Sequence, residues 1–138
     1  MLWLKNLINL SLIRYAIVGV GNTVFGLSII FLVKYIGAGD LVANATGYFF
    51  GLLLGFRLNS KWTFRYRDKL LPAFYRFCAV IGTSYLLNLA VVFFAIQQMA
   101  INTYVSQAMG VIPYTIFSYL GLRYLVFPEP KKSANQNQ

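Results

Sequence analysis

Residues 14–35 read RYAIVGVGNTVFGLSIIFLVKY, a basic residue followed by a long and almost uninterrupted apolar stretch. About 62 residues later, Arg76-Phe77 opens a second stretch of the same kind. Each stretch is followed by a short polar gap and a further apolar span. The closing residues also correspond, since Trp62-Thr63-Phe64 ends one half and Leu125-Val126-Phe127 ends the other. The pattern predicts that one pair of spans is duplicated.

The composition indicates that these spans cross a membrane. The chain has 138 residues, of which 59% are hydrophobic and 11% are charged, and a soluble bundle would need polar helix faces that these spans lack. Each span is close in length to the ~20 residues that are needed to cross the hydrocarbon layer. The sequence therefore predicts an all-α membrane protein with four transmembrane helices, arranged as two parallel-repeat helical hairpins: Tyr15–Ile36, Leu41–Phe56, Phe77–Ile96 and Tyr104–Leu122.

The basic residues predict the orientation of the spans. They lie before the first span, in the link between the second and third spans, and after the fourth, whereas the two short gaps contain only Asp40, with Lys34 just before the first gap. Because Lys and Arg stay on the cytoplasmic side, we expect a multi-pass protein of the cell (inner or plasma) membrane with both termini cytoplasmic. The net charge of +9 is then a feature of the inner leaflet and does not indicate a nucleic-acid partner.

Three segments are predicted. Residues 1–13 form an N-terminal interfacial amphipathic helix, because their apolar side chains fall on one helical stripe. Residues 14–127 form the transmembrane domain, with repeat one at 14–64 and repeat two at 76–127. Residues 128–138 are polar and form a disordered cytoplasmic tail.

The chain lacks the residues that most enzymes need. It has no His, and its acids, Asp40, Asp68 and Glu129, all lie outside the spans. Cys78 is alone and is expected to be an inert, reduced thiol. These absences leave no nucleophile with a base, no carboxylate pair and no metal cluster. We expect no catalytic residues, no metal, no cofactor and no enzymatic activity.

Small and polar residues inside the spans have two interpretations each. The second span contains a glycine ladder at Gly47, Gly51 and Gly55, which indicates either close helix packing or contact with another copy of the chain. Asn22, Asn44 and Asn88 are costly at membrane depth unless they are hydrogen-bonded. They either bond to one another or bind a polar ligand. Both alternatives stay open from the sequence.

Basic residues recur at the ends of the spans in both halves: Arg14, Arg57, Lys61, Arg76 and Arg123. One interpretation is that they only orient the spans and contact anionic headgroups. The other is that they bind a phosphate at headgroup level, because guanidinium groups form paired, charge-assisted bonds with phosphate.

The residues of both halves resemble the GtrA-like family of small four-span membrane proteins. The similarity rests on Arg14-Tyr15, Gly19, Asn22-Thr23, Ala43-Asn44, Gly47, Phe56, Asn59 and Lys61-Trp62-Thr63-Phe64, and it covers about residues 12 to 127. Arg57 departs from the pattern, because the family usually has an uncharged residue there. The resemblance implies a flippase that translocates polyprenyl-phosphate-linked sugars across the membrane for cell-surface polysaccharide or glycan modification.

The expected partners are the sugar lipid, the membrane, membrane glycosyltransferases and further copies in a homo-oligomer. The residues expected to contact the lipid-linked sugar or its phosphate are Arg14, Asn22, Asn44, Asn59, Lys61, Arg76 and Arg123. One alternative is a non-transporting membrane anchor or scaffold that recruits a glycosyltransferase. A proton-coupled exporter of cations would need a carboxylate within the membrane, and the spans contain none.

Overall fold

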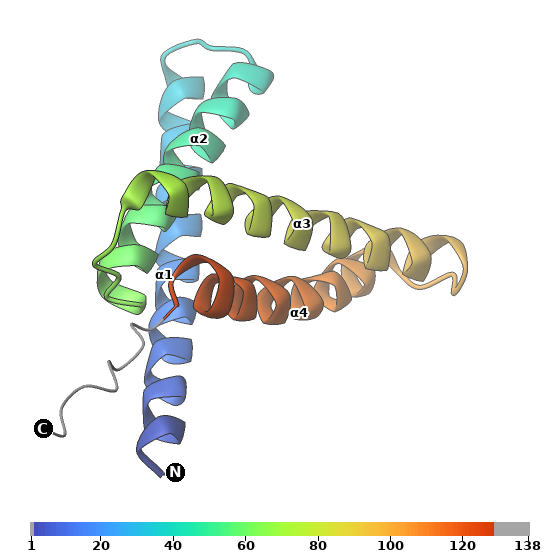
Figure 1. Ribbon diagram of the computed structural model, residues 1–138. Helices are drawn as coiled ribbons and strands as arrows, with labels where there is room; N and C mark the ends of the chain where they lie inside the picture. The colour runs from blue at the N-terminus through green and yellow to red at the C-terminus, as the bar shows by residue number, and fades with distance from the viewer. Residues whose placement is uncertain (1, 129–138) are drawn as a thin grey trace, which may run out of the picture. The chain divides into compact units, whose positions relative to one another are not determined.

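The computed structural model describes the backbone of residues 2–128 and the side chains of residues 10–102 and 104–128. This part of the chain is helical and contains no strand, which confirms the predicted all-α class. The helices are α1 (Leu2–Tyr35), α2 (Asp40–Leu58), α3 (Leu70–Gln97) and α4 (Thr103–Gly121) (Figure 1). Two short π-helical segments extend them: η1 (Asn59–Thr63) follows α2, and η2 (Leu122–Val126) follows α4.

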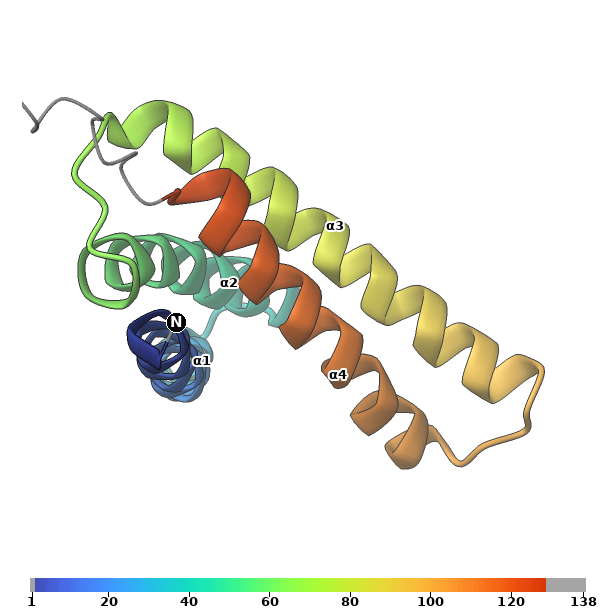
Figure 2. The ribbon, with the colours of Figure 1, turned by 60° about the horizontal axis from the view of Figure 1, so that its bottom comes forward.

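The chain divides into two units, Met1–Arg67 and Asp68–Gln138, and each contains one helical hairpin. In the first unit, α1 packs against α2 and η1; in the second, α3 packs against α4 and η2. Figure 2 shows α3 and α4 side by side along their length. Each hairpin thus consists of a long helix and a shorter helix with a π-helical end.

Glycines bring α1 and α2 into close contact. A Cβ atom on Gly47 would lie 2.9 Å from the carbonyl oxygen of Gly26 and 2.3 Å from Cγ1 of Ile30, so no larger residue fits without movement. Gly51 and Gly55 are also buried and lie against Asn22. The glycine ladder therefore packs within the hairpin, as the close-packing interpretation predicts, and α1 covers the face that another copy would need.

The second hairpin also has close contacts at glycines, and Gly110 corresponds to Gly47 in the repeat. A Cβ atom on Gly110 would lie 2.7 Å from Nδ2 of Asn88 and 2.7 Å from Cγ2 of Val92, and one on Gly121 would lie 2.6 Å from Cγ1 of Val80. Small residues at these crossings let the helix backbones approach each other.

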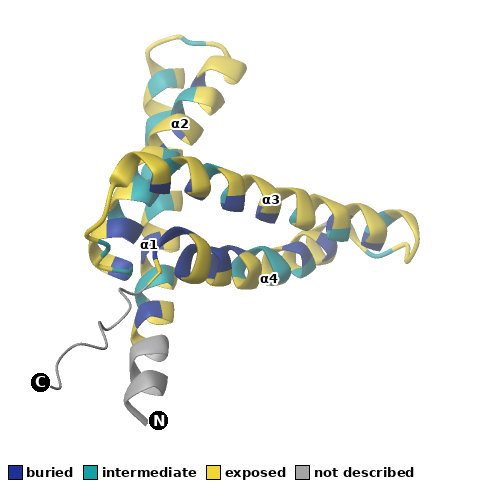
Figure 3. Ribbon diagram, in the orientation of Figure 1, coloured by how far each residue is buried: buried dark blue, intermediate teal, exposed yellow. Residues whose placement is uncertain are grey.

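The remaining helix surface is largely apolar. Large hydrophobic side chains are exposed on all four helices; examples are Phe31, Phe49, Phe93 and Ile116. Figure 3 shows exposed residues along the length of each helix. Such a surface is unsuited to water and suited to lipid, because lipid tails are as apolar as these side chains.

Three helical stretches of the described chain are long and apolar enough to span a membrane: Leu10–Tyr35, Asp40–Thr63 and Leu70–Gln97. Helix α4 is not among them, although the sequence predicts a fourth span there. Its 19 residues include Pro113 and the polar Gln107, Thr115 and Ser118, which lower its hydropathy. The support for α4 as the fourth predicted span is therefore its packing against α3, and not its hydropathy.

The terminal segments differ in how far the structure describes them. Helix α1 begins at Leu2 and continues without a break through Arg14, so residues 2–13 are helical. Their predicted placement at the membrane surface depends on side chains that mostly lie outside the described residues. Most of the predicted disordered tail, residues 129–138, also lies outside them.

Candidate functional site

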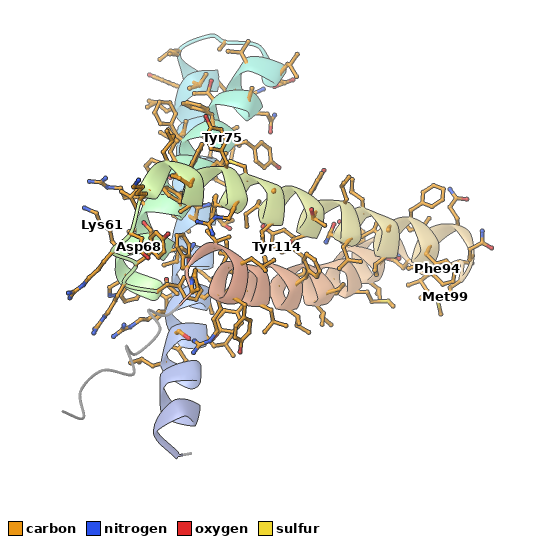
Figure 4. The ribbon with its side chains drawn as sticks, in the orientation of Figure 1. Lys61, Asp68, Tyr75, Phe94, Met99 and Tyr114 are labelled. Atoms are coloured by element: carbon orange, nitrogen blue, oxygen red, sulfur yellow. The ribbon has the colours of Figure 1, made fainter. Side chains whose placement is uncertain are left out.

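In each of the two hairpins, taken separately, the basic residues lie at one end. In the first unit, Arg14, Arg57 and Lys61 lie at the end opposite the α1–α2 loop, and Figure 4 shows Lys61 pointing away from the helices. Lys34 lies near the loop and forms an ion pair with Asp40. In the second unit, Arg76 and Arg123 lie at the end opposite the α3–α4 loop. Phe94 and Met99, near that loop, carry no charge (Figure 4).

Arg14 joins α1 to η1. Its Nη1 lies 3.4 Å from the carbonyl oxygen of Trp62, to which it donates a hydrogen bond. Its Cζ lies 5.7 Å from the centroid of the Trp62 ring, within the range of a cation–π interaction. A bond of this length is weak, so the ring and the carbonyl together hold the guanidinium loosely in place.

Arg76 occupies the same position in the second hairpin. Its Nη1 donates to the carbonyl oxygen of Leu125 across 3.2 Å, and its Nε lies 3.4 Å from the carbonyl oxygen of Pro72. Arg76 corresponds to Arg14, and Leu125 to Trp62, in the duplicated sequence pattern. The two repeats therefore share this arginine–carbonyl contact as well as their helices.

Both contacted carbonyls belong to π-helical segments. In η1, the N–H of Phe64 donates to the carbonyl oxygen of Asn59 at 2.9 Å, and in η2, the N–H of Phe127 donates to that of Leu122 at 2.8 Å. Each bond spans five residues instead of the four of an α-helix. Such π-helical turns are rare and are frequently found at functional sites. Their recurrence at the same position in both repeats marks this end of each hairpin as a candidate site.

The asparagines divide into two locations. Asn22 of α1 lies beside Gly51 and Gly55, because a Cβ atom on Gly55 would be 3.6 Å from its Oδ1. Asn59 is buried at 5% exposure, and its Nδ2 donates to the carbonyl oxygen of Gly55 at 2.9 Å. Gly55 thus brings Asn22 and Asn59 to the same part of the α1–α2 interface.

Asn44 lies elsewhere. It is exposed near the start of α2, and its Nδ2 donates to the carbonyl oxygen of Asp40 at 2.9 Å. Fifteen residues separate it from Asn59, which is about 22 Å along a helix. Within the first unit, four of the predicted residues therefore lie at or towards the basic end, opposite the α1–α2 loop: Arg14, Asn22, Asn59 and Lys61. Asn44 lies near the loop.

The remaining predicted residues differ in exposure. Lys61 and Arg57 are exposed, whereas Arg123 is only 9% exposed, and its Cζ lies 5.9 Å from the Tyr124 ring centroid. Arg123 therefore does not extend to the surface as Arg57, Lys61 and Arg76 do.

Thr63 is a candidate that the sequence interpretation did not single out as a site residue. It is 4% exposed, and its Oγ1 has no hydrogen-bond partner. The available signal was its spacing, because Thr63 continues the four-residue steps of Gly47, Gly51, Gly55 and Asn59. It lies in η1, one residue after the carbonyl that Arg14 contacts.

The comparison with known proteins gives one clear relationship. The model of the family described as GtrA/DPMS, transmembrane domain, matches residues 14–127, which include both hairpins from Arg14 to Phe127. No curated protein sequence matches the chain. The matched region contains every candidate residue described above and most of the chain. The protein therefore belongs to the GtrA/DPMS transmembrane-domain family.

Proposed function

We propose that this protein translocates a polyprenyl-phosphate-linked sugar across the cell membrane for surface polysaccharide or glycan modification. The observation that carries the proposal is the arginine at the π-helical end of each hairpin, Arg14 beside Trp62 and Arg76 beside Leu125. Membership in the GtrA/DPMS family supports the same class of substrate. The protein acts by binding and moving the lipid, with no catalytic step.

When the phosphate binds, Arg14 and Arg76 exchange a backbone carbonyl oxygen for a phosphate oxygen, which is a stronger hydrogen-bond acceptor. The bonds from Arg14 and Arg76 to carbonyl oxygens are 3.4 Å and 3.2 Å long. A phosphate offers the guanidinium shorter, charge-assisted and paired bonds. Lys61, exposed on η1, adds a positive charge at the same end of the first hairpin. In the absence of lipid, the two arginines thus bond the carbonyl oxygens of η1 and η2. A lipid phosphate replaces these carbonyl oxygens as the hydrogen-bond acceptor.

The basic end of each hairpin faces the cytoplasm in this proposal, and both termini are cytoplasmic. Lys34 lies at the loop end, opposite the basic end, but it is consistent with this orientation because its charge is compensated by the ion pair with Asp40. The prenyl tail stays in lipid against the apolar helix surface, while the polar headgroup crosses along the hairpins. Asn59, Asn22 and Asn44 lie in that order from the basic end to the loop end, and we place them along this path.

The partners follow from the substrate. One membrane glycosyltransferase loads the sugar onto the lipid inside, and another uses it outside. Two hairpins offer little enclosed volume for a sugar phosphate, so the protein acts as a homo-oligomer. The exposed apolar surface, rather than the covered glycine ladder, supplies the contacts between copies.

Reconstitution tests the proposal directly. Purified protein in liposomes should move a fluorescent polyprenyl-phosphate sugar from one leaflet to the other, and Arg14→Gln with Arg76→Gln should abolish the movement. Arg67→Gln is the control, since Arg67 is an exposed residue of the link. Wild-type protein that binds a glycosyltransferase but leaves the lipid in its original leaflet would instead support the anchor function.

A further inference from the structure

The first hairpin contains three buried oxygen atoms without a hydrogen-bond partner. Over the described residues, the unpartnered buried side-chain atoms are Oδ1 of Asn22, Oδ1 of Asn59 and Oγ1 of Thr63. All three belong to the first unit, where α1 packs against α2 and η1. A buried polar atom left unbonded costs free energy, so native proteins rarely keep such atoms without a reason.

Thr63 differs from the other hydroxyl residues of the spans. Their hydroxyl groups donate to carbonyl oxygens of the preceding helical turn, as seen for Thr23, Ser28, Thr46, Ser60, Thr83, Ser84, Ser106, Thr115 and Ser118. This is the usual way in which a hydroxyl group is satisfied in a membrane helix. Thr63 makes no such bond, because its Oγ1 has no hydrogen-bond partner. The Thr63 hydroxyl is left available for another group.

The two asparagines present acceptor atoms. Asn59 uses its Nδ2 to bond the carbonyl oxygen of Gly55, which leaves Oδ1. Oδ1 of Asn22 lies against Gly55, 3.6 Å from where a Cβ atom on that glycine would be. Amide oxygens accept hydrogen bonds and do not donate them. The group that satisfies them must be a donor, such as a hydroxyl group.

The second hairpin lacks this arrangement. By the repeat, Asn22 corresponds to Ser84, and Asn59 and Thr63 correspond to Leu122 and Val126. Ser84 is fully buried and bonds the carbonyl oxygen of Val80 at 2.7 Å, and both Leu122 and Val126 are buried and apolar. The unpartnered acceptors are thus a property of repeat one, whereas the arginine–carbonyl contact is common to both repeats.

We propose that Asn22, Asn59 and Thr63 form a hydroxyl-binding site for the neutral sugar of the lipid headgroup, separate from the arginines that bind its phosphate. This inference rests on the proposed function and adds that different residues bind the sugar and the phosphate. A phosphodiester carries acceptor oxygens and a negative charge, so amide oxygens would repel it and would favour a hydroxyl-rich ring. Thr63, which can both accept and donate, completes the set.

The sugar reaches these atoms through the α1–η1 interface. Gly51 and Gly55 have no side chains, and the Asn22 side chain lies against both of them. The phosphate meanwhile stays near Arg14, two helical turns from Asn22 at the end of the hairpin.

The test compares two phosphodiesters that differ only in the sugar. Full-length protein is titrated with the methyl ester of a polyprenyl phosphate, here called the bare phosphate, and with the same lipid carrying glucose or mannose in place of the methyl group. Wild-type protein should bind at least one sugar form more tightly than the bare phosphate. Thr63→Val, which has nearly the same shape, should lower affinity for that sugar form about tenfold and leave affinity for the bare phosphate unchanged.

A matched variant and a stability measurement complete the experiment. Thr23→Val makes the same change at an exposed residue of the same hairpin and should leave both affinities unchanged. Thr63→Val should unfold at the same or a higher temperature, because no hydrogen bond is lost. An equal loss for both lipids, or a wild-type protein with no preference for sugar, overturns the hydroxyl site while phosphate binding stands. Failure of wild-type protein to bind either lipid overturns the proposed function too.

Discussion

Arg76 donates a hydrogen bond from Nη1 to the backbone carbonyl oxygen of Leu125, 3.2 Å away, and so joins α3 to the π-helical end of α4. Arg14 makes the equivalent bond to Trp62 in the first hairpin. A cation at the C-terminal end of a helix is favourable, because the carbonyl groups there carry partial negative charge. The pairing accounts for the arginine at the start of each repeat.

Loss of either arginine should weaken lipid binding more than it weakens the fold. Arg14→Gln and Arg76→Gln should each reduce the affinity for a polyprenyl phosphate by about 1.5–3 kcal/mol, the value of one hydrogen bond to a charged group. The carbonyl bond lost by Arg14 is long at 3.4 Å, and that lost by Arg76 lies at the upper end of the ordinary range at 3.2 Å, so thermal unfolding in detergent should change little. Affinity can be measured by calorimetry, with Arg67→Gln as the control. Full affinity in both variants would mean that the arginines only orient the spans.

Glycine substitutions should distinguish the close crossings from open helix surface. Gly47→Ala should destabilise the first hairpin by about 1–3 kcal/mol, because its Cβ would meet the Gly26 backbone and Ile30. Gly110→Ala should do the same in the second hairpin, where the Cβ would meet Asn88 and Val92. Gly19→Ala is the control: nothing lies within 4 Å of its Cβ position, and alanine favours a helix. Thermal unfolding in detergent measures the three. Equal stability of all three variants would contradict the described packing.

The basic ends of the hairpins should lie on the cytoplasmic side. In a Cys78→Ser background, a cysteine at Gly39, in the loop before α2, should react with an impermeant reagent added outside intact cells. A cysteine at Ser133 should react only after the membrane is opened. Asp68→Cys, in the link between the units, should behave like Ser133→Cys. Labelling of Gly39→Cys and Ser133→Cys from the same side would refute the orientation.

Transport should respond to membrane potential and should not need a proton gradient. The sequence has no His, and no acid lies within the predicted spans, so the chain has no side chain suited to a proton relay there. Moving one phosphate charge outward, from a negative interior, is favoured by about 2.3 kcal/mol per 100 mV. In proteoliposomes, the labelled lipid should cross at equal pH and faster towards the positive side. Strict dependence on a pH difference, with no effect of potential, would show that another group carries a proton.

Much of the architecture follows from local properties of the sequence. The duplicated order of basic residue, apolar span and polar gap predicts two helical hairpins, because span length and hydrophobicity do not depend on what a helix packs against. The step of four between Gly47, Gly51 and Gly55 likewise places them on one face, and that face does pack against α1. Helix α4 was predicted as a span in the same way, but its polar residues and Pro113 reduce its hydropathy, and it is not among the described stretches that are apolar enough to span a membrane.

The tertiary structure decided which polar residues have partners. From the sequence, Asn22, Asn44 and Asn59 are equivalent, yet Asn44 bonds within its own helix near the loop, while Asn22 and Asn59 meet around Gly55 with unpartnered oxygens. The difference depends on the stagger of α1 against α2, which the contact between Gly26 and Gly47 sets. Stagger is a non-local property, because it is set by residues about twenty positions apart in sequence that meet only once the hairpin has closed. The same holds for Arg14 and Arg76, whose carbonyl partners lie 48 and 49 residues away along the chain.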